Sequence, residues 1–243
     1  MKWVDYDALC AIPEKLRNYR RDKLSGNRFR LALATRDQLL MDMLTMLAWR
    51  PRHIRECRLK PRRVANLFKV GIPKNGPIAN RRPIKEASRI SPQLKFWQIR
   101  FRPEETKTGR PVRFLAPSQL TTLLEEYIDH HRPLLFKGKD PGTLFLNSSG
   151  RPLTSYSLRY LVENLTARFA GRRVNPLSFR HAIAVKWLED NTNNYMTPSK
   201  MLWHADIRTV LKTYGVQFDE PRAARRLNKW LARNRKDKKT KGR

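Results

Sequence analysis

Apolar residues recur at helical spacing in several segments of the chain. In the strongest such segment, the apolar residues occupy positions that share one face of a helix. They are Leu39, Leu40, Met43, Leu44 and Leu47. Thr35 precedes these residues, and Gln38 follows it by three positions, a pairing typical of a helix start. We therefore expect a helix that begins near Thr35. Pro51 fits the first position of a second, short helix, which places Arg50 at the junction between the two.

A different period marks the middle of the chain. Residues 60–92 show no clear period and are expected to form loops with at most short strands. The next residues alternate, with Trp97, Ile99 and Phe101 apolar and the residues between them polar, as in a half-buried strand. Val112 and Phe114 mark a returning strand. The connection, Lys107–Arg110, is expected to be a hairpin turn.

Helical spacing prevails after the hairpin. Helices are expected to begin at Ser118, at Thr154 or Ser155, at Asn175-Pro176, at Thr197-Pro198, at Asp206 and at Asp219. Gly171 is expected to end the second of these, and Tyr214 lies at the end of the fifth. The last carries Leu227, Trp230 and Leu231 on one face. The predicted fold is mainly helical with a small antiparallel sheet, an α+β architecture.

The charge of the chain narrows the class of partner. Its 243 residues suit one large domain or two small ones. Lys and Arg together number 52 against 21 Asp and Glu, a net charge of +31. So basic a surface favours an anionic partner, of which nucleic acid is the leading candidate. Ribosomal proteins and proteins of the membrane surface are the alternatives.

Neither secretion nor a bound metal is indicated. Cys10 and Cys57 have no spacing typical of a zinc site or a disulfide framework. The first thirty residues lack a signal-peptide core, and no apolar run approaches the length of a membrane span. We expect a cytoplasmic or nucleoid-associated protein with no membrane partner.

Four segments resemble the tyrosine recombinase (phage integrase) family. They are Trp49–Ile54 with the following Arg58-Leu59, Glu105–Arg110 in the hairpin turn, Asn175–His181, and Met201–Ile207 followed by Thr213-Tyr214. In the family these segments carry a helix-end Arg, a catalytic Lys, a His-x-x-Arg-His motif, and a Leu-Gly-His motif with the nucleophilic Tyr nine or ten residues later. The resemblance extends over roughly residues 35–233. Each motif alone is weak, whereas four in order are specific.

The resemblance implies a catalytic set of Arg50, Lys107, Arg180, His204 and Tyr214. The two arginines would clamp the non-bridging oxygens of a phosphodiester. Tyr214 would attack the phosphorus, Lys107 would protonate the leaving 5′ oxygen, and His204 would bind the phosphate or relay the Tyr proton. No acidic cluster with metal-ligand spacing and no phosphate-binding Gly-rich loop is evident, so this chemistry needs no cofactor.

Three residues depart from the family pattern. Leu177 stands where the family usually has His and sometimes Lys, so one position for proton transfer is empty. Trp203 replaces the usual Gly, which changes packing more than chemistry. His53 stands where many members have an acidic residue that supports the first Arg, so a different environment around Arg50 is expected.

The implied activity is site-specific recombination of double-stranded DNA through a 3′-phosphotyrosyl intermediate, by a dimer to tetramer on DNA. The implied organisation is a basic lead-in or linker at 1–30, a catalytic domain at 31–233 and a basic disordered tail at 234–243. Family members usually carry a separate N-terminal DNA-clamping domain, so the chain is a catalytic fragment or a minimal protein. The alternatives are a non-catalytic DNA-binding protein on this fold, a type IB topoisomerase-like enzyme that relaxes DNA, and a basic RNA-binding protein.

Each candidate residue also has an ordinary structural explanation. Arg50 can cap the preceding helix, Lys107 can be a turn residue, and Arg180 can pair with a core carboxylate. His204 can be a buried histidine, and Tyr214 a core aromatic. For His181 we expect the structural role, a hydrogen bond to backbone beneath the site. Residues 60–95 and the last helix are expected to contact DNA backbone, although a solvated basic surface explains their charge nearly as well.

Overall fold

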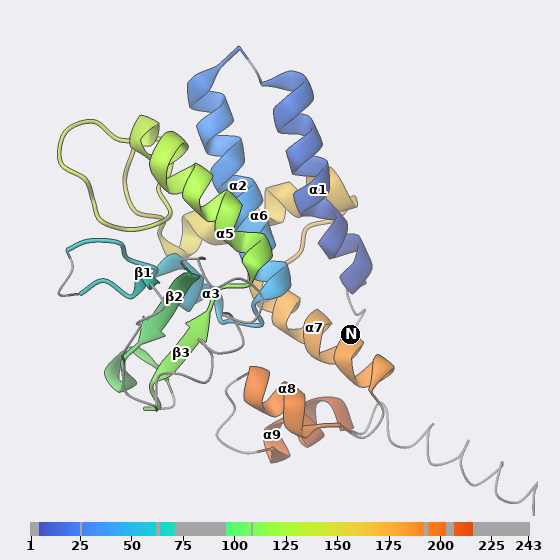
Figure 1. Cartoon of the computed structure of the whole chain (residues 1–243). Coiled ribbons are helices and arrows are strands. Elements are labelled where there is room, and N and C mark those ends of the chain that lie inside the picture. Colours follow the sequence, from blue (N-terminus) through green and yellow to red (C-terminus); the bar gives the residue numbers. More distant parts are fainter. Residues whose placement is uncertain are drawn as a thin grey trace, which may run out of the picture. The chain divides into compact units, whose positions relative to one another are not determined.

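The computed structural model describes residues 5–24, 26–61, 64–70, 96–107, 109–191, 194–202 and 207–215 (Figure 1). In chain order the elements are α1 (Tyr6–Lys23), α2 (Arg28–Met46), α3 (Pro51–Arg55), β1 (Leu67–Val70), β2 (Phe96–Phe101), η2 (Pro103–Glu105), β3 (Val112–Leu115), α5 (Ser118–Glu126), η3 (Tyr127–His131), η4 (Arg132–Leu135), α6 (Ser155–Ala170), α7 (Pro176–Asp190), α8 (Met196–Met201), α9 (Arg208–Val210) and η5 (Leu211–Gly215). They fall into two compact units, 1–182 and 183–243, with the boundary inside α7. The predicted mainly helical fold with a small antiparallel sheet is confirmed.

Residues 1–30 contain a long helix, so the prediction of a lead-in or linker is wrong for Tyr6–Lys23. The carboxylate of Asp5 accepts a hydrogen bond from the backbone N–H of Asp7 and so caps the first turn of α1. Leu9, Ile12 and Leu16 are buried, and α1 packs along α2 (Figure 1). These three residues recur at helical spacing, but the many charged residues between them conceal the period.

The helix expected to start near Thr35 begins about two turns earlier, at Arg28. Asn27 caps α2, and its side-chain oxygen accepts a hydrogen bond from the backbone N–H of Arg30 at 2.9 Å. Thr35 lies inside the helix, where its hydroxyl donates to the carbonyl of Leu31 at 2.8 Å. Thr35 and Gln38 are therefore buried residues inside the helix and do not form a capping box. The apolar face from Leu39 to Leu44 is buried as predicted.

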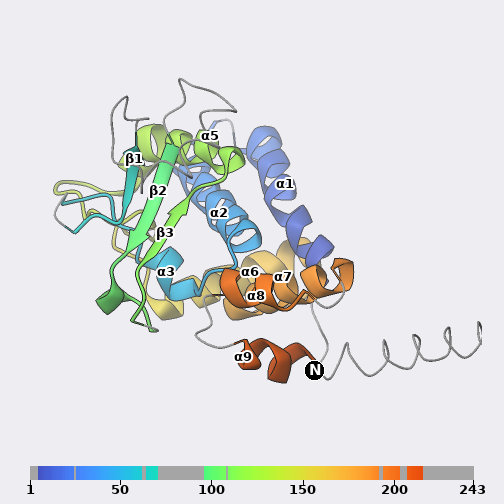
Figure 2. The ribbon, with the colours of Figure 1, turned by 60° about the horizontal axis from the view of Figure 1, so that its bottom comes forward.

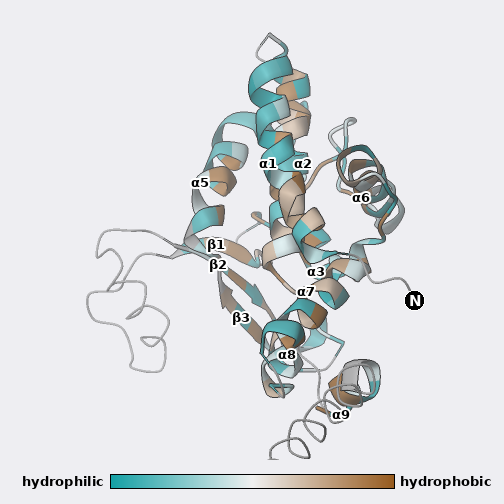
Figure 3. Cartoon of the chain, turned by 90° about the vertical axis from the view of Figure 1, so that its right-hand side faces the viewer, coloured by the Kyte–Doolittle hydropathy of each residue, from teal (hydrophilic) through white to brown (hydrophobic). Residues whose placement is uncertain are grey.

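The sheet has the strand order β1-β2-β3, with both pairs antiparallel. Trp97, Ile99 and Phe101 are buried while Arg100 is exposed, which confirms the predicted alternation. Figure 3 shows hydrophobic and hydrophilic residues alternating along β2 and β3. In Figure 2, α2 and α3 lie beside this sheet. The region 60–92 contributes the short strand β1, in line with the expectation, and 71–95 lie outside the described residues.

The remaining helices of the first unit begin and end close to the predicted residues. Thr154 caps α6 by accepting a hydrogen bond from the backbone N–H of Ser157 at 3.0 Å. Gly171 ends that helix in the left-handed conformation, with φ of 75°. α5 begins at Ser118, and Pro117 precedes it at the N-cap position. α7 begins at Pro176 as predicted.

The second unit is described only in part. α8 begins at Met196, one residue before the predicted Thr197-Pro198. α9 and η5 follow and end at Gly215, as expected for the helix that carries Tyr214. The predicted cap Asp206, the predicted last helix and the predicted basic tail lie outside the described residues.

Candidate active site

The junction between α2 and α3 is fixed against the sheet by aromatic contacts. α2 ends at Met46, and Arg50 lies at the N-terminal boundary of α3, with φ of −67° and ψ of 139°. The Trp49 ring packs edge-on against Phe101, at 6.1 Å between centroids, and against Phe114, at 5.4 Å. Because Trp49 is buried, the backbone of the half-buried Arg50 is held in place. Arg50 does not cap the helix before it.

Arg180 reaches this junction from α7. Its side chain is buried, and its guanidinium donates a hydrogen bond to the main-chain carbonyl of Ala48. Ala48 precedes Arg50 by two residues, so one hydrogen bond joins the segments that carry the two predicted arginines. A neutral carbonyl orients the guanidinium without cancelling its positive charge.

His53 lies close to both arginines. It is 3% exposed, and its ring lies 4.8 Å from the Phe101 ring, centroid to centroid. Burial, followed by the positive charges of Arg50 and Arg180, lowers the pKa of His53 to about 4. The imidazole is therefore neutral near pH 7. Where many family members have a carboxylate, this chain places an uncharged ring beside two cations.

Lys107 lies in the connection between β2 and β3, as predicted. Its side chain is exposed. The hydroxyl of the preceding Thr106 contacts the carbonyls of Pro103 at 3.0 Å and Arg110 at 2.9 Å. Gly109 has φ of 63°, which favours glycine. The backbone of the turn is thus fixed on both sides of a solvent-facing lysine.

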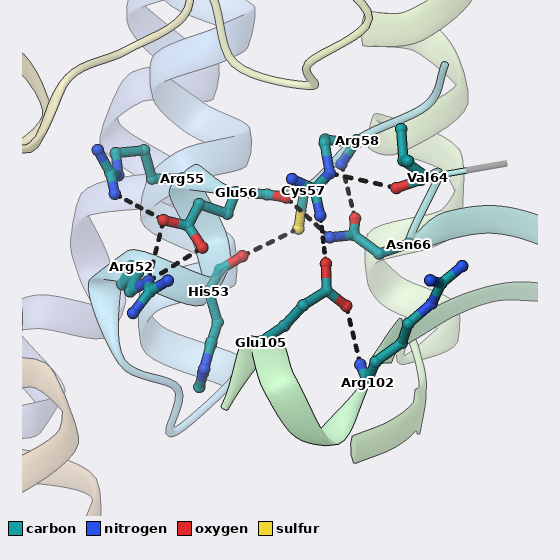
Figure 4. Close-up of polar contacts among 10 residues, drawn as sticks. All are labelled: Arg52, His53, Arg55, Glu56, Cys57, Arg58, Val64, Asn66, Arg102 and Glu105. Carbon is teal, nitrogen blue, oxygen red and sulfur yellow. Dashed lines mark hydrogen bonds and ion pairs between the residues drawn. The ribbon is translucent and has the colours of Figure 1, made fainter. Parts of the chain in front are cut away.

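A polar network ties the Lys107 turn to the end of α3, as Figure 4 shows. Arg58 forms an ion pair with Glu105, which also accepts the backbone N–H of Arg102 at 2.8 Å. The buried Asn66 accepts the backbone N–H of Arg58 at 2.6 Å and donates to the carbonyl of Glu56 at 2.8 Å. Arg58 and Glu105 lie in segments that the sequence singled out, but sequence reasoning missed the contact between them. They stand 47 positions apart, and no local pattern connects them.

The start of α7 presents the largest departure from the family pattern. Leu177 is 45% exposed, one helical turn before Arg180. Leu177 therefore does not belong to the core. His181 is half-buried, and burial and then the charge of Arg180 lower its pKa.

The remaining two candidate residues belong to the second unit. Tyr214 lies in η5, the last described element, where the structure describes its backbone. His204 lies outside the described residues. The structure thus brings Arg50, Arg180 and His53 together and tethers the Lys107 turn through Arg58, while the places of His204 and Tyr214 in the site stay predictions.

Among the described residues, no group of three or more His, Cys, Asp or Glu side chains could hold a metal ion. No described helix is long and apolar enough to cross a membrane.

Sequence comparison finds relatives for part of the chain. No protein-family model matches it. It is 33% identical over 88 residues to the tyrosine recombinase XerD of Staphylococcus saprophyticus, an alignment that covers 36% of this chain and 30% of the relative. It is 34% identical over 90 residues to the tyrosine recombinase XerC of Lactobacillus delbrueckii, with the same coverage of both chains. The alignments thus span less than a third of these relatives.

Structural comparison covers nearly the whole chain. A crystal structure of the XerH site-specific recombinase bound to its palindromic difH substrate superposes with a TM-score of 0.59 and 17% identity, over 95% of this chain and 53% of that one. The XerA recombinase superposes with a TM-score of 0.52 and 14% identity, over 87% of this chain and 59% of that one. The fold is that of these recombinases. The chain is thus similar to tyrosine recombinases over 88–90 residues of its sequence, and its fold resembles that of the XerH and XerA recombinases.

Proposed function

We propose that the chain is the DNA-cleaving and rejoining part of a site-specific recombinase, with Tyr214 as the nucleophile. The observation that carries the proposal is the hydrogen bond from Arg180 to the Ala48 carbonyl, beside Arg50 and the neutral His53. Two positively charged guanidinium groups at one junction, both close enough to His53 to lower its pKa, make a site for an anion. The relatedness to XerD, XerC and XerH supports DNA as the source of that anion.

The chemistry follows from charge. A phosphodiester carries one negative charge and gains more as it approaches a pentavalent transition state. Arg50 and Arg180 would bind the non-bridging oxygens, where that charge develops. The loss of a single such donor typically costs about 10²–10³-fold in rate. Unlike the carboxylate found at this position in many family members, His53 places no negative charge beside the two arginines, and its lowered pKa keeps the ring neutral.

The proton transfers fall to other residues. The phenol of Tyr214 has an ordinary pKa near 10, so its attack needs a positive environment or an acceptor, the role proposed for His204. Lys107, exposed on its anchored turn, would donate a proton to the 5′ oxygen as that oxygen leaves. The phosphotyrosyl bond retains the energy of the cleaved linkage. Rejoining therefore requires no nucleotide.

The surroundings of the enzyme belong to the same proposal. The net charge of +31 suits double-stranded DNA, and strand exchange needs two to four protomers on it. Such an enzyme would act in the cytoplasm, at the nucleoid if a bacterium or phage encodes it.

Covalent capture of DNA tests the proposal. The protein is mixed with a pool of nicked, random-sequence duplexes, and adducts that survive denaturing electrophoresis are sequenced. We expect a slower band with the native chain and none with Tyr214→Phe, which should keep nearly all of its DNA affinity because one hydroxyl is lost. Sites recovered in this way are then placed on a supercoiled plasmid. Recombinant products support recombination, whereas relaxation alone indicates a topoisomerase-like enzyme, and an adduct that persists in Tyr214→Phe contradicts the proposal.

A further inference from the structure

The outer face of the sheet carries two arginines directly opposite each other. In the antiparallel register of β2 and β3, Arg100 pairs with Arg113, and both side chains are exposed. Directly opposed residues of an antiparallel pair lie on the same face of the sheet. Like charges in that position destabilise a sheet. A phosphate bound across the pair would contact both guanidinium groups.

This face is turned away from the candidate active site. Trp49 and His53 contact Phe101 and Phe114, whose positions alternate with those of Arg100 and Arg113 along the two strands. Successive side chains of a strand point to opposite faces. The arginine pair and the Arg50–Arg180 site therefore lie on opposite faces of one sheet.

A groove of about 940 Å³ adjoins Arg100. Its apolar lining includes Val64, Ala65 and Phe68. Of the charged side chains that line it, five are basic and two are acidic. Glu105 pairs with Arg58, and Asp140 and Glu125 pair with the lining residues Lys60 and Lys69. Counting these carboxylates as well, the groove keeps a small excess of positive charge, which comes from Arg100 and Arg102.

We propose that this outer face binds the sugar-phosphate backbone of duplex DNA, in a contact separate from the one at Arg50 and Arg180. The proposal rests on the proposed function for its choice of ligand. Opposed arginines match the regularly spaced phosphates of a duplex. A second copy of this chain is disfavoured as the occupant, because each copy carries +31. Strand exchange brings more than one DNA segment to a protein, and a second surface would hold the segment that is not being cleaved.

Salt dependence of DNA binding measures this contact. The double variant Arg100→Gln/Arg113→Gln is compared with Arg28→Gln/Arg30→Gln, which removes two exposed arginines from the first turn of α2. Affinity for a random-sequence duplex is measured by fluorescence anisotropy over a range of salt concentrations. Each phosphate contact contributes about 0.9 to the slope of log affinity against log salt concentration. We expect the slope to fall by about 1–2 in the sheet variant and to stay unchanged in the α2 variant.

Two results would overturn the inference. One is an equal change of slope in both variants, or no change in either, which would mean that the arginine pair is not a specific contact. The other is tighter binding of a poly-glutamate peptide than of DNA, lost in the sheet variant, which would identify an acidic protein as the partner. Circular dichroism checks that both variants are folded.

Adduct formation separates this inference from the proposed function. On a short nicked duplex that covers only the cleavage site, the sheet variant should form the Tyr214 adduct as fast as the native chain. A loss of adduct there would place Arg100 and Arg113 in the catalytic contact and contradict a separate surface. The native chain could instead form no adduct while the difference in slope between the two variants remains. That result would reject the proposed DNA cleavage by Tyr214 but would leave the DNA contact of the sheet in place.

Discussion

The guanidinium of Arg180 donates a hydrogen bond to the backbone carbonyl of Ala48, across 132 positions of sequence. The bond is buried, so water cannot replace either partner if the other is removed. It fixes where α7 meets the junction that carries Arg50. A single contact therefore supports both the packing of the first unit and the distance between its two candidate phosphate ligands.

Replacing Arg180 with Lys separates charge from geometry. Lys keeps the positive charge but lacks the planar fork of donors. In a single-turnover assay on a nicked substrate, we expect Arg180→Lys to slow cleavage by about 10²-fold or more, with nonspecific DNA binding nearly unchanged. Arg173→Lys, at an exposed position, is the matched control. Parallel losses of binding and cleavage in Arg180→Lys would argue against a role in the transition state.

The Arg58–Glu105 ion pair should affect the cleavage rate by positioning Lys107. Removing the Glu105 side chain frees the turn from the end of α3, so Lys107 would donate its proton to the leaving 5′ oxygen less often. We expect Glu105→Ala to slow cleavage by about 10-fold or more, whereas Glu104→Ala, next to it and exposed, should not. A substrate whose 5′ leaving atom is sulfur needs no proton and should restore the rate. A rate that sulfur does not restore would indicate a general structural defect.

A substitution at Leu177 should increase the rate of DNA cleavage. Its 45% exposure means that His fits without opening a cavity. General acid–base catalysis is typically worth about 10²–10⁴-fold, so we expect Leu177→His to speed single-turnover cleavage, and Leu177→Gln, which cannot titrate near neutral pH, to have no effect. Thermal unfolding should be unchanged in both. Equal rates in Leu177→His and the native chain would show that position 177 does not reach the phosphate.

Because of Asp42, we expect the free energy of unfolding to depend on pH. Burial raises its pKa to about 6, above its ordinary value of 3.8. The folded state therefore favours the protonated form, and stability falls as pH rises from about 4 through 6. Asp42→Asn should raise the free energy of unfolding at pH 7 by up to roughly 2–3 kcal/mol, and by little at pH 4. Chemical denaturation at both pH values measures this. Asp129→Asn, at an exposed position, is the control, and a gain that is equal at both pH values would refute the assignment.

The sequence alone determined those elements whose signals are local. The apolar period from Leu39 to Leu44, the alternation around Ile99, and the boundaries at Pro51 and Gly171 each depend on a few neighbouring residues, and the structure confirms all of them. Where local signals are diluted or ambiguous, the prediction failed. Charged residues concealed the apolar face of α1, and a cap-like pair at Thr35 lies inside a helix.

For the candidate site, the sequence supplied the identities of the residues and the structure supplied the contacts. Motif order singled out Arg50, Lys107 and Arg180, because the types and spacings of residues are written in the chain. Which backbone carbonyl Arg180 meets, and that Glu105 anchors the lysine turn, depend on packing between segments far apart in sequence. The pairing of Arg100 with its opposite arginine depends on strand register, which only the folded sheet fixes, because a shift of one residue would turn every side chain to the other face.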